Sequence, residues 1–286
     1  MSSNTAQAIT PALRNWIVEQ AQAGHKPEAV LAAMRSSGWE ESIAIRALEE
    51  TLQTHLNEHA QANGLPEPKL VPGPDLSGSK PVLLADGHEV KVLTVLQHPR
   101  VIVFGGLLSD AECDEIMALA DKRLSRSETV ATSSDGSEVN AARTSDGMFF
   151  ERGEHPVIAK LESRIAELLD WPVQNGEGLQ ILRYRPGAEY QPHYDYFEPE
   201  HVSTPSILKR GGQRVGTIVM YLNTPEAGGA TTFPDIKFEV SPVRGNAVFF
   251  SYDRPHPMTM TLHGGAPVIA GQKWVATKWL REGKFE

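Results

Sequence analysis

The sequence predicts an α+β protein in which a core of short strands follows a small helical module. After residue 179, apolar and β-branched stretches alternate at close spacing with Gly- and Pro-rich turns, which is typical of a β-barrel or a two-sheet jelly roll. Two stretches with helical periodicity precede these strands. A Pro- and Gly-rich segment separates this region from the first 57 residues.

Residues 1–57 predict a module of three short helices. The prolines and glycines that bound the first two helices are Pro11, Gly24, Pro27 and Gly38. The turn Ser37-Gly38-Trp39, followed by apolar residues at helical spacing, is similar to that of ubiquitin-associated three-helix modules. A module that binds a protein partner and a helical appendage that packs on itself or on the main domain both agree with this pattern.

Residues 58–82 predict a linker, because prolines and glycines break helices and cannot pair in a central strand. The domain boundary is therefore expected here, and residues 83–286 form the main domain. Stretches 92–96 and 101–104 are rich in β-branched residues and predict its first strands.

Two helices are expected before the core strands, over about 107–120 and 155–169. Ser109 is a suitable N-cap for the first helix, with acidic residues in the first turn. Cys113 lies inside this helix and is expected to be a small buried residue. Both helices are predicted to cover one face of a sheet.

The stretch 126–147 between these helices is rich in Ser, Thr, Asp and Gly. So long a segment inside a compact domain indicates either a functional lid or disorder. Because a metal site is predicted in the same domain, as described next, we favour a mobile substrate lid. The expected core strands that follow span 179–184, 214–222, 229–233, 246–252, 258–263 and 273–280.

A candidate metal site begins with His193 and Asp195, which lie two positions apart in an extended stretch. Residues i and i+2 of a strand share one face, so an imidazole and a carboxylate can reach one ion there. His263, which follows the predicted strand at 258–262, is the best candidate for a third ligand. His201 lies in a polar loop that is too close in sequence, and His256 stands between two prolines.

Two histidines and one carboxylate on a β scaffold form the facial triad of non-haem Fe(II) oxygenases. The alternative is that these are ordinary strand and turn residues. Lys273, ten positions after His263, favours the site, because it opens a strand whose alternate residues share a face. The residues expected on that face are Lys273, Val275, Thr277 and Trp279.

Composition narrows the possible partners and the compartment. The net charge is −9 and no basic cluster is present, which argues against nucleic acid and an anionic membrane surface as partners. The one cysteine excludes an intrachain disulfide and favours a reducing compartment. No leader or membrane-spanning stretch is recognisable, so a cytoplasmic protein is expected.

Five motifs in order resemble those of the prolyl 4-hydroxylases, which are 2-oxoglutarate- and Fe(II)-dependent dioxygenases. They are Leu182–Phe197, Gly212–Leu222, Gly228–Pro234, Gly245–Phe250 and Leu262–Trp279. The resemblance extends from the helix near residue 107 to the last residue and leaves out the N-terminal module. It implies a double-stranded β-helix, or jelly roll, with flanking helices.

The same resemblance implies roles for individual residues. His193, Asp195 and His263 would bind iron, and Lys273 would pair with the distal carboxylate of 2-oxoglutarate. Tyr184 and Thr231 match positions that hydrogen-bond this cosubstrate, while Tyr190, Arg214 and Trp279 match residues of the peptide groove. The groove position two after Trp279 is often His in relatives and is Arg281 here, which leaves the substrate contacts open.

The resemblance implies a peptidyl prolyl 4-hydroxylase that couples oxidative decarboxylation of 2-oxoglutarate to hydroxylation of proline. Fe(II), 2-oxoglutarate and O2 would be required, with ascorbate as the reductant and a proline-containing peptide or protein as the substrate. One alternative keeps the chemistry and changes the acceptor to lysine, a free amino acid or a small molecule. Another is a non-catalytic, cupin-like scaffold that binds metal or peptide.

Overall fold

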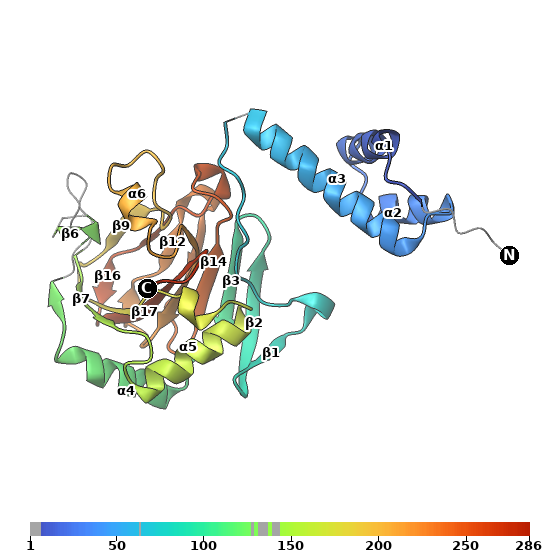
Figure 1. Ribbon diagram of the computed structural model, residues 1–286. Coiled ribbons are helices and arrows are strands. Elements are labelled where there is room, and N and C mark those ends of the chain that lie inside the picture. Colours follow the sequence, from blue (N-terminus) through green and yellow to red (C-terminus); the bar gives the residue numbers. More distant parts are fainter. Residues whose placement is uncertain (1–6, 63, 127–128, 131–136, 139–143) are drawn as a thin grey trace. The chain divides into compact units, whose positions relative to one another are not determined.

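The computed structural model describes residues 7–62, 64–126, 129–130, 137–138 and 144–286 (Figure 1). The chain divides into two compact units, Met1–Pro68 and Lys69–Glu286. In the described part of the chain, no helix combines the length and the apolar character needed to span a membrane.

The first unit contains three helices, α1 (Pro11–Gln22), α2 (Pro27–Ser36) and α3 (Glu41–Ala62). Thr10 caps α1, since its side chain accepts a hydrogen bond from the backbone N–H of Leu13. The helices enclose a small core of their own. Its buried residues are Ile17, Val30, Met34, Ala44, Ala47 and Leu48.

The segment predicted as a linker, 58–82, differs in the structure at both ends. Helix α3 continues to Ala62 rather than ending at residue 57. Residues from Lys69 onward belong to the second unit, where the backbone N–H of Gly73 donates to the carbonyl of Leu169 at 2.8 Å. Pro72 and Pro74 are buried there. A proline-rich chain can pack in this way because it has few N–H groups that need partners.

The second unit is organised around a nine-stranded sheet whose neighbouring strands pair in antiparallel fashion. In spatial order the strands are β1 (Val82–Ala85), β2 (His88–Leu96), β3 (Arg100–Gly105), β14 (Ala247–Ser251), β10 (Arg214–Tyr221), β17 (Lys273–Arg281), β8 (Leu179–Tyr184), β7 (Asp146–Phe150) and β4 (Ser125–Arg126). Strand β17 therefore lies between β10 and β8, deep inside the sheet.

A second sheet of four strands has the order β13-β12-β15-β9. Its strands are β13 (Phe238–Val240), β12 (Thr231–Phe233), β15 (His263–Gly265) and β9 (Tyr190–His193). Two further pairs are β11 (Ala227–Gly228) with β16 (Val268–Ala270), and β5 (Thr129–Val130) with β6 (Ser137–Glu138). The short helical elements are η1 (Ser77–Ser79), η2 (Val173–Asn175), α6 (Thr204–Ile207), η3 (Pro234–Ile236) and η4 (Pro257–Thr259).

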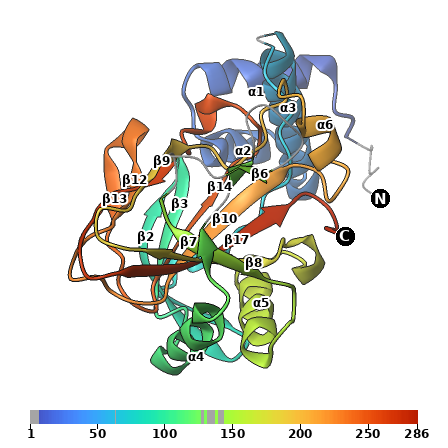
Figure 2. The same ribbon diagram turned by 90° about the vertical axis from the view of Figure 1, so that its left-hand side faces the viewer.

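Helices α4 (Asp110–Asp121) and α5 (Pro156–Leu168) cover one face of the large sheet (Figure 2). Ser109 and Glu112 form a capping box at the start of α4, as the sequence indicates for Ser109. Cys113 lies on the buried side of α4, and burial raises the pKa of its thiol to about 11. The cysteine is therefore a packing residue, as predicted.

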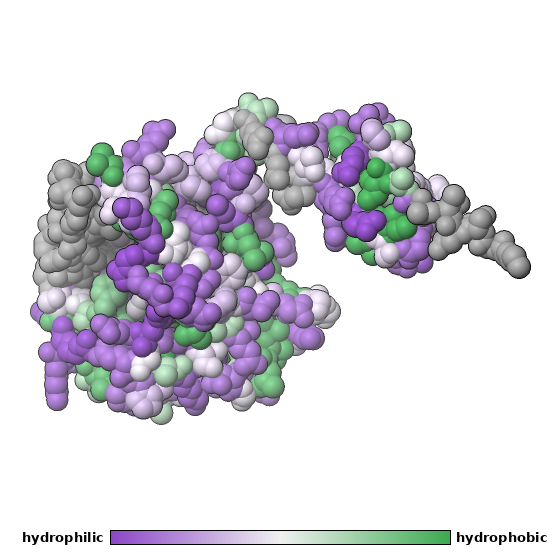
Figure 3. Space-filling view, viewed as in Figure 1, coloured by the Kyte–Doolittle hydropathy of each residue, from purple (hydrophilic) through white to green (hydrophobic). Residues whose placement is uncertain are grey.

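The other face of the large sheet packs against the four-stranded sheet. Residues of β3, β8, β10, β14 and β17 share a core there with Phe233 and Val240 of the smaller sheet. Side chains of the large sheet alternate between this core and the helix-covered core, as the period of two requires. The predicted α+β jelly roll with flanking helices is confirmed. The outer surface in Figure 3 is mostly hydrophilic, with small hydrophobic patches.

Five of the six predicted core strands coincide with β8, β10, β12, β14 and β17 to within two residues. The strand predicted over 258–263 is wrong except at its last residue. Residues 257–259 form η4, in which the backbone N–H of Met258 donates to the ring of His256, and Met260 just after it adopts a left-handed φ of 53°. These features interrupt the extended backbone until β15 begins at His263. Most of the predicted lid, 126–147, lies outside the described residues.

Candidate metal centre

His193, Asp195 and His263 lie together between the two sheets. His193 ends β9 and His263 begins the adjacent antiparallel strand β15, where the two residues are directly opposite each other. One ligand atom from each of the three residues lies within 4.8 Å of the other two. The Nε2 atoms of His193 and His263 are 3.5 and 3.4 Å from the Asp195 carboxylate oxygens. Two imidazoles and one carboxylate with this geometry suit Fe(II).

Hydrogen bonds orient both imidazoles toward the shared centre. The Nδ1 atom of His193 is 2.9 Å from the carbonyl of Gln191, and that of His263 is 3.0 Å from the carbonyl of Thr261. A carbonyl can only accept, so Nδ1 carries the proton in each ring. Nε2 therefore keeps its lone pair for a metal ion.

The charge states of the cluster also suit metal binding. Burial, together with the neighbouring His263, lowers the pKa of His193, which favours its neutral form. Burial alone would raise the pKa of Asp195, but the electrostatic influence of the two adjacent imidazoles, that of His263 first, holds that pKa well below its usual range. A neutral imidazole and an ionised carboxylate are the forms that coordinate a metal.

A hydroxyl pair behind the carboxylate supports Asp195. The Thr217 hydroxyl on β10 donates to Oδ2 of Asp195 at 2.8 Å, and Thr217 also contacts the Tyr252 hydroxyl at 2.9 Å. Thr217 is fully buried and Tyr252 almost so. Sequence reasoning missed both residues, because nothing local distinguishes a strand threonine that faces a ligand from one that faces the core.

The metal-binding cluster opens into a cavity between the sheets, with an empty volume of about 460 Å³ that includes space open to solvent. The prediction that alternate residues of β17 share the site face is confirmed, since Lys273, Val275, Thr277 and Trp279 all line the cavity. The remaining lining residues are Gln180, Leu182, Tyr184, Tyr190, His193, Asp195, Val219, Thr231, His263, Gly264 and Gly265.

Lys273 places a buried cation in this cavity. The residue is only 4% exposed, and burial lowers the pKa of its ammonium from 10.5 to about 8. Among the residues that the structure describes, none forms a hydrogen bond or an ion pair with it; its neighbours are the rings of Tyr184 and Tyr221, at 5.5 and 5.9 Å. A buried cation in this state is stabilised by an anionic ligand. The cavity thus combines a cluster of metal-ligand side chains with a buried cation, the two kinds of group that bind carboxylates.

The other two residues expected to bind the cosubstrate lie beside Lys273. Tyr184 on β8 is directly opposite Lys273 in the sheet. Thr231 on β12 reaches the cavity from the smaller sheet, and its hydroxyl accepts a hydrogen bond from Tyr221 at 2.8 Å. The structure thus brings Tyr184 and Thr231 to the end of the cavity where the buried cation lies.

Two of the three residues expected in the peptide groove line the cavity. The ring of Tyr190 stacks on His193 with the centroids 3.8 Å apart. Trp279 is 8% exposed, and its indole nitrogen is buried without an acceptor among the described residues. Phe149, half exposed, lies 6.4 Å from Trp279 and was not expected from the sequence.

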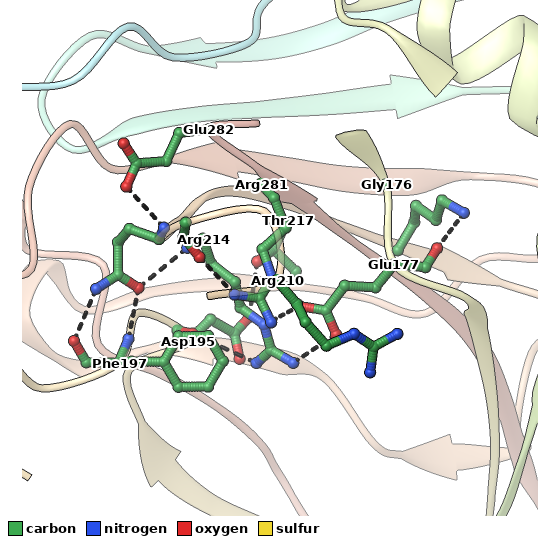
Figure 4. A network of polar contacts seen from close by, with 12 residues as sticks. Gly176, Glu177, Asp195, Phe197, Arg210, Arg214, Thr217, Arg281 and Glu282 are labelled. Atoms are coloured by element: carbon green, nitrogen blue, oxygen red, sulfur yellow. Dashed lines mark hydrogen bonds and ion pairs between the residues drawn. The ribbon is translucent and has the colours of Figure 1, made fainter. Parts of the chain in front are cut away.

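Arg214 lies behind Trp279 instead of lining the cavity. Its guanidinium is 4.0 Å from the indole centroid and forms a two-pronged ion pair with Glu177, at 2.6 and 2.9 Å (Figure 4). Arg281 binds the same carboxylate at 2.7 Å. Burial would raise the pKa of Glu177, but the two arginines lower it below its ordinary value. Glu177 was missed because it precedes β8 in a stretch without any motif.

Comparison with known proteins places the chain in a family. A family model described as the 2OG-Fe(II) oxygenase superfamily matches residues 179–281. Prolyl 4-hydroxylase 2 of Arabidopsis thaliana is 36% identical over 219 residues, which cover 68% of this chain and 72% of the relative. Probable prolyl 4-hydroxylase 3 of the same plant is 37% identical over 209 residues, covering 66% and 71%.

A solved structure agrees with these relatives. The viral collagen prolyl hydroxylase of Paramecium Bursaria Chlorella virus-1, in its 2OG complex, superimposes with a TM-score of 0.51 at 31% sequence identity. The match covers 63% of this chain and 95% of the viral one. The chain therefore belongs to the prolyl 4-hydroxylase family of 2OG-Fe(II) oxygenases, as its motifs predict. It is a 2-oxoglutarate- and Fe(II)-dependent dioxygenase.

Proposed function

We propose that this enzyme hydroxylates proline in a peptide or protein and couples this reaction to the decarboxylation of 2-oxoglutarate to succinate and carbon dioxide. The names of its relatives support proline as the acceptor. The observation that carries the proposal is the shared cavity, which is lined both by the three-ligand cluster and by the buried Lys273.

The predicted site residues of the cavity have distinct roles in this proposal. His193, Asp195 and His263 would hold Fe(II), and bound Fe(II) with O2 would supply the oxidising power for both half-reactions. Lys273 would pair with the distal carboxylate of 2-oxoglutarate, whose other end would reach the metal. Tyr184 and Thr231 would flank the cosubstrate, because both lie beside Lys273.

Aromatic side chains at the cavity suit a proline-containing peptide. Tyr190 and Trp279 line the cavity, and Phe149 extends this aromatic surface into the solvent. Extended proline-rich segments bind to aromatic-lined grooves, because their conformation is already set before binding. Tyr190 and Trp279 would contact the peptide directly, while Arg214 would support Trp279 from behind.

Three finer points belong to the same proposal. Ascorbate would serve as the reductant that keeps the iron ferrous between turnovers, which an assay with and without ascorbate would test. The cytoplasm would be the compartment, since the only cysteine is a buried thiol and no disulfide supports the fold. The first unit would be an accessory module that binds a protein partner, with catalysis confined to the second.

Turnover of proline peptides tests the proposal. With Fe(II), 2-oxoglutarate and O2, we expect stoichiometric succinate and a mass gain of one oxygen atom, located on proline by fragmentation. His193→Ala should lose Fe(II) binding and turnover together, whereas His201→Ala, outside the cluster, should keep both. Succinate release without modified proline would assign another acceptor, such as lysine or a small molecule. Absence of any succinate with the metal bound would leave only a scaffold function.

A further inference from the structure

Three arginines and three aromatic rings alternate in a continuous stack that ends at the cavity. Guanidinium groups lie over rings along the whole series, which we call the arginine–aromatic stack. At the surface, the guanidinium of Arg210 lies over the ring of Phe285, 4.3 Å from its centroid. Next, the guanidinium of Arg281 lies 5.1 Å from the centroid of Phe285 and 4.7 Å from that of Phe197. Innermost, the guanidinium of Arg214 lies 4.8 Å from the centroid of Phe197 and 4.0 Å from that of Trp279. Of these six residues, only Trp279 lines the cavity.

One carboxylate holds the inner part of the stack. Glu177 binds Arg214 through both oxygens and Arg281 through one, and Figure 4 shows the two guanidinium groups converging on it. The side chains of Arg214, Arg281 and Glu177 are 14%, 4% and 10% exposed. Charge-assisted contacts in a desolvated site are stronger and more directional than surface ion pairs. The two inner cations are therefore held in fixed positions.

Backbone contacts hold the carboxylate in turn. The backbone N–H of Glu177 donates to the carbonyl of Trp279 at 3.0 Å, and its carbonyl accepts from the buried ammonium of Lys278. Lys278 projects from the opposite face of β17 and also pairs with Glu162 of α5. Glu177 is thus tied to the same strand that carries Trp279.

Hydrogen bonds also anchor the backbone at two of the ring residues. The side-chain amide of Gln213 accepts from the backbone N–H of Phe197 at 2.7 Å and donates to its carbonyl at 2.8 Å. Gln213 is 5% exposed, so solvent does not compete for these bonds. Phe285 is held by a backbone hydrogen bond to the carbonyl of Gln174 at 2.9 Å.

We propose that the arginine–aromatic stack is a positioning device for the peptide site, and that Phe197, Arg281 and Phe285 set the orientation of the Trp279 indole without touching substrate. The proposal rests on the proposed function, since it takes Trp279 as a wall of the peptide site. Arg281 is the distinctive member, because it couples Phe285 and Phe197 to the carboxylate that holds Arg214. Residues outside the cavity would then control how well peptide binds.

Indole NMR of the full-length protein tests the structural half of the proposal without any turnover. The chain has five tryptophans, and the Trp279→Phe variant identifies which of the five indole N–H signals belongs to Trp279. We expect this signal to shift in Phe197→Leu and in Arg281→Gln, and less in Phe285→Leu, which lies farther along the stack. Phe197→Tyr keeps the ring face and should leave the signal near its wild-type position.

Kinetics with a proline peptide test the functional half. Losing the desolvated cation–ring contacts of Phe197 or Arg281 should raise the peptide KM by roughly 5- to 30-fold in Phe197→Leu and Arg281→Gln. kcat, the Kd of 2-oxoglutarate and peptide-independent decarboxylation should stay within about twofold, because Lys273 and the metal ligands are untouched. Phe197→Tyr should restore the wild-type KM.

Arg183→Gln is the matched control. The guanidinium of Arg183 lies 5.3 Å from the ring of Trp274, also on β17, and it is likewise ion-paired, to Asp121 and Asp146. Trp274 faces the helix-covered core instead of the cavity. This substitution removes the same kind of contact, so it should shift the Trp274 indole signal and leave the peptide KM unchanged.

The outcomes separate the two proposals. An unmoved Trp279 signal in Phe197→Leu would overturn the positioning role, as would a moved signal with an unchanged peptide KM. A parallel loss of 2-oxoglutarate affinity would also overturn it, because general damage to the fold would then explain the kinetics. If the wild-type enzyme modifies no proline peptide while the Trp279 indole signal shifts in the variants as expected, the proposed substrate is wrong. The stack would then still set the orientation of the Trp279 indole.

Discussion

Replacing Lys273 by methionine should distinguish 2-oxoglutarate from 2-oxopentanoate, which has the same chain length but lacks the distal carboxylate. Methionine fills a similar volume without a charge, so the cavity keeps its shape. The substitution removes the one charged group that we expect to recognise the far end of the cosubstrate. The metal ligands at the near end remain unchanged.

The magnitude follows from the burial of the ammonium. Its pKa falls from 10.5 to about 8, and burial is the cause. At about 1.4 kcal/mol for each pKa unit, holding this cation unpaired costs about 3 kcal/mol. A carboxylate that pairs with it can recover a similar amount, which corresponds to roughly a hundredfold in Kd. The variant should therefore bind 2-oxoglutarate roughly a hundredfold more weakly and 2-oxopentanoate about as well as the wild type does.

Anaerobic equilibrium binding with Fe(II) present measures both ligands without turnover. The ratio of the two Kd values isolates the contribution of the distal carboxylate, since any general damage to the site affects both ligands equally. The wild-type ratio should be large, and the ratio in Lys273→Met should approach one. Equal losses for both ligands, or an unchanged Kd for 2-oxoglutarate, would refute the assigned role of Lys273.

Three further outcomes are expected. The wild-type affinity for 2-oxoglutarate should be constant below about pH 8 and fall up to tenfold per pH unit above it, because the Lys273 ammonium of the ligand-free enzyme loses its proton there. The affinity of Lys273→Met should lack this decline. Thr217→Val removes the donor to Asp195 and should weaken Fe(II) binding about 10- to 100-fold in an anaerobic titration, whereas Tyr252→Phe leaves that donor in place and should lose less. A chain of residues 69–286 should fold and keep turnover within about twofold of the full chain, whereas its failure to fold would contradict an accessory role for the first unit.

A final prediction concerns acid stability. Burial would raise the pKa of Glu112, but Arg164 and Ser109 lower it from 4.5 to about 2. A carboxyl group whose pKa is lower in the folded than in the unfolded chain stabilises the fold at pH values above its unfolded pKa of 4.5. This stabilisation disappears as the pH falls toward 2. Thermal unfolding should show a lower Tm for Glu112→Gln than for the wild type at about pH 6, and a narrower difference at about pH 3. A constant difference across this range would contradict the ion pair with Arg164.

The sequence was informative wherever a local pattern has one structural meaning. His193 and Asp195 do meet in one cluster, although Asp195 lies in a bend just after β9, and alternate residues of β17 line the cavity because strand residues two apart share a face. The cap at Ser109 is equally local, since its partner Glu112 lies within the first turn. The prediction failed at 258–262, where the ring of His256 accepts a hydrogen bond from the backbone N–H of Met258 and the chain leaves the extended conformation.

The linker prediction shows a different limit. Proline and glycine between 58 and 82 correctly exclude regular strands from most of that segment, but they do not say whether the chain packs against a neighbour. Gly73 forms its hydrogen bond with Leu169, far away in sequence. Local composition describes the backbone conformation, whereas burial depends on the partner surface.

By itself the sequence determined the type of ligands, their spacing along each strand and the family to which the chain belongs. The tertiary structure alone decided that His263 lies opposite His193, that Thr217 supports Asp195, and that Arg214 binds Glu177 behind Trp279. These contacts join segments that lie far apart in the sequence, and their alignment depends on the packing of both sheets at once. No local periodicity encodes that alignment, so only the folded chain shows which side chains meet.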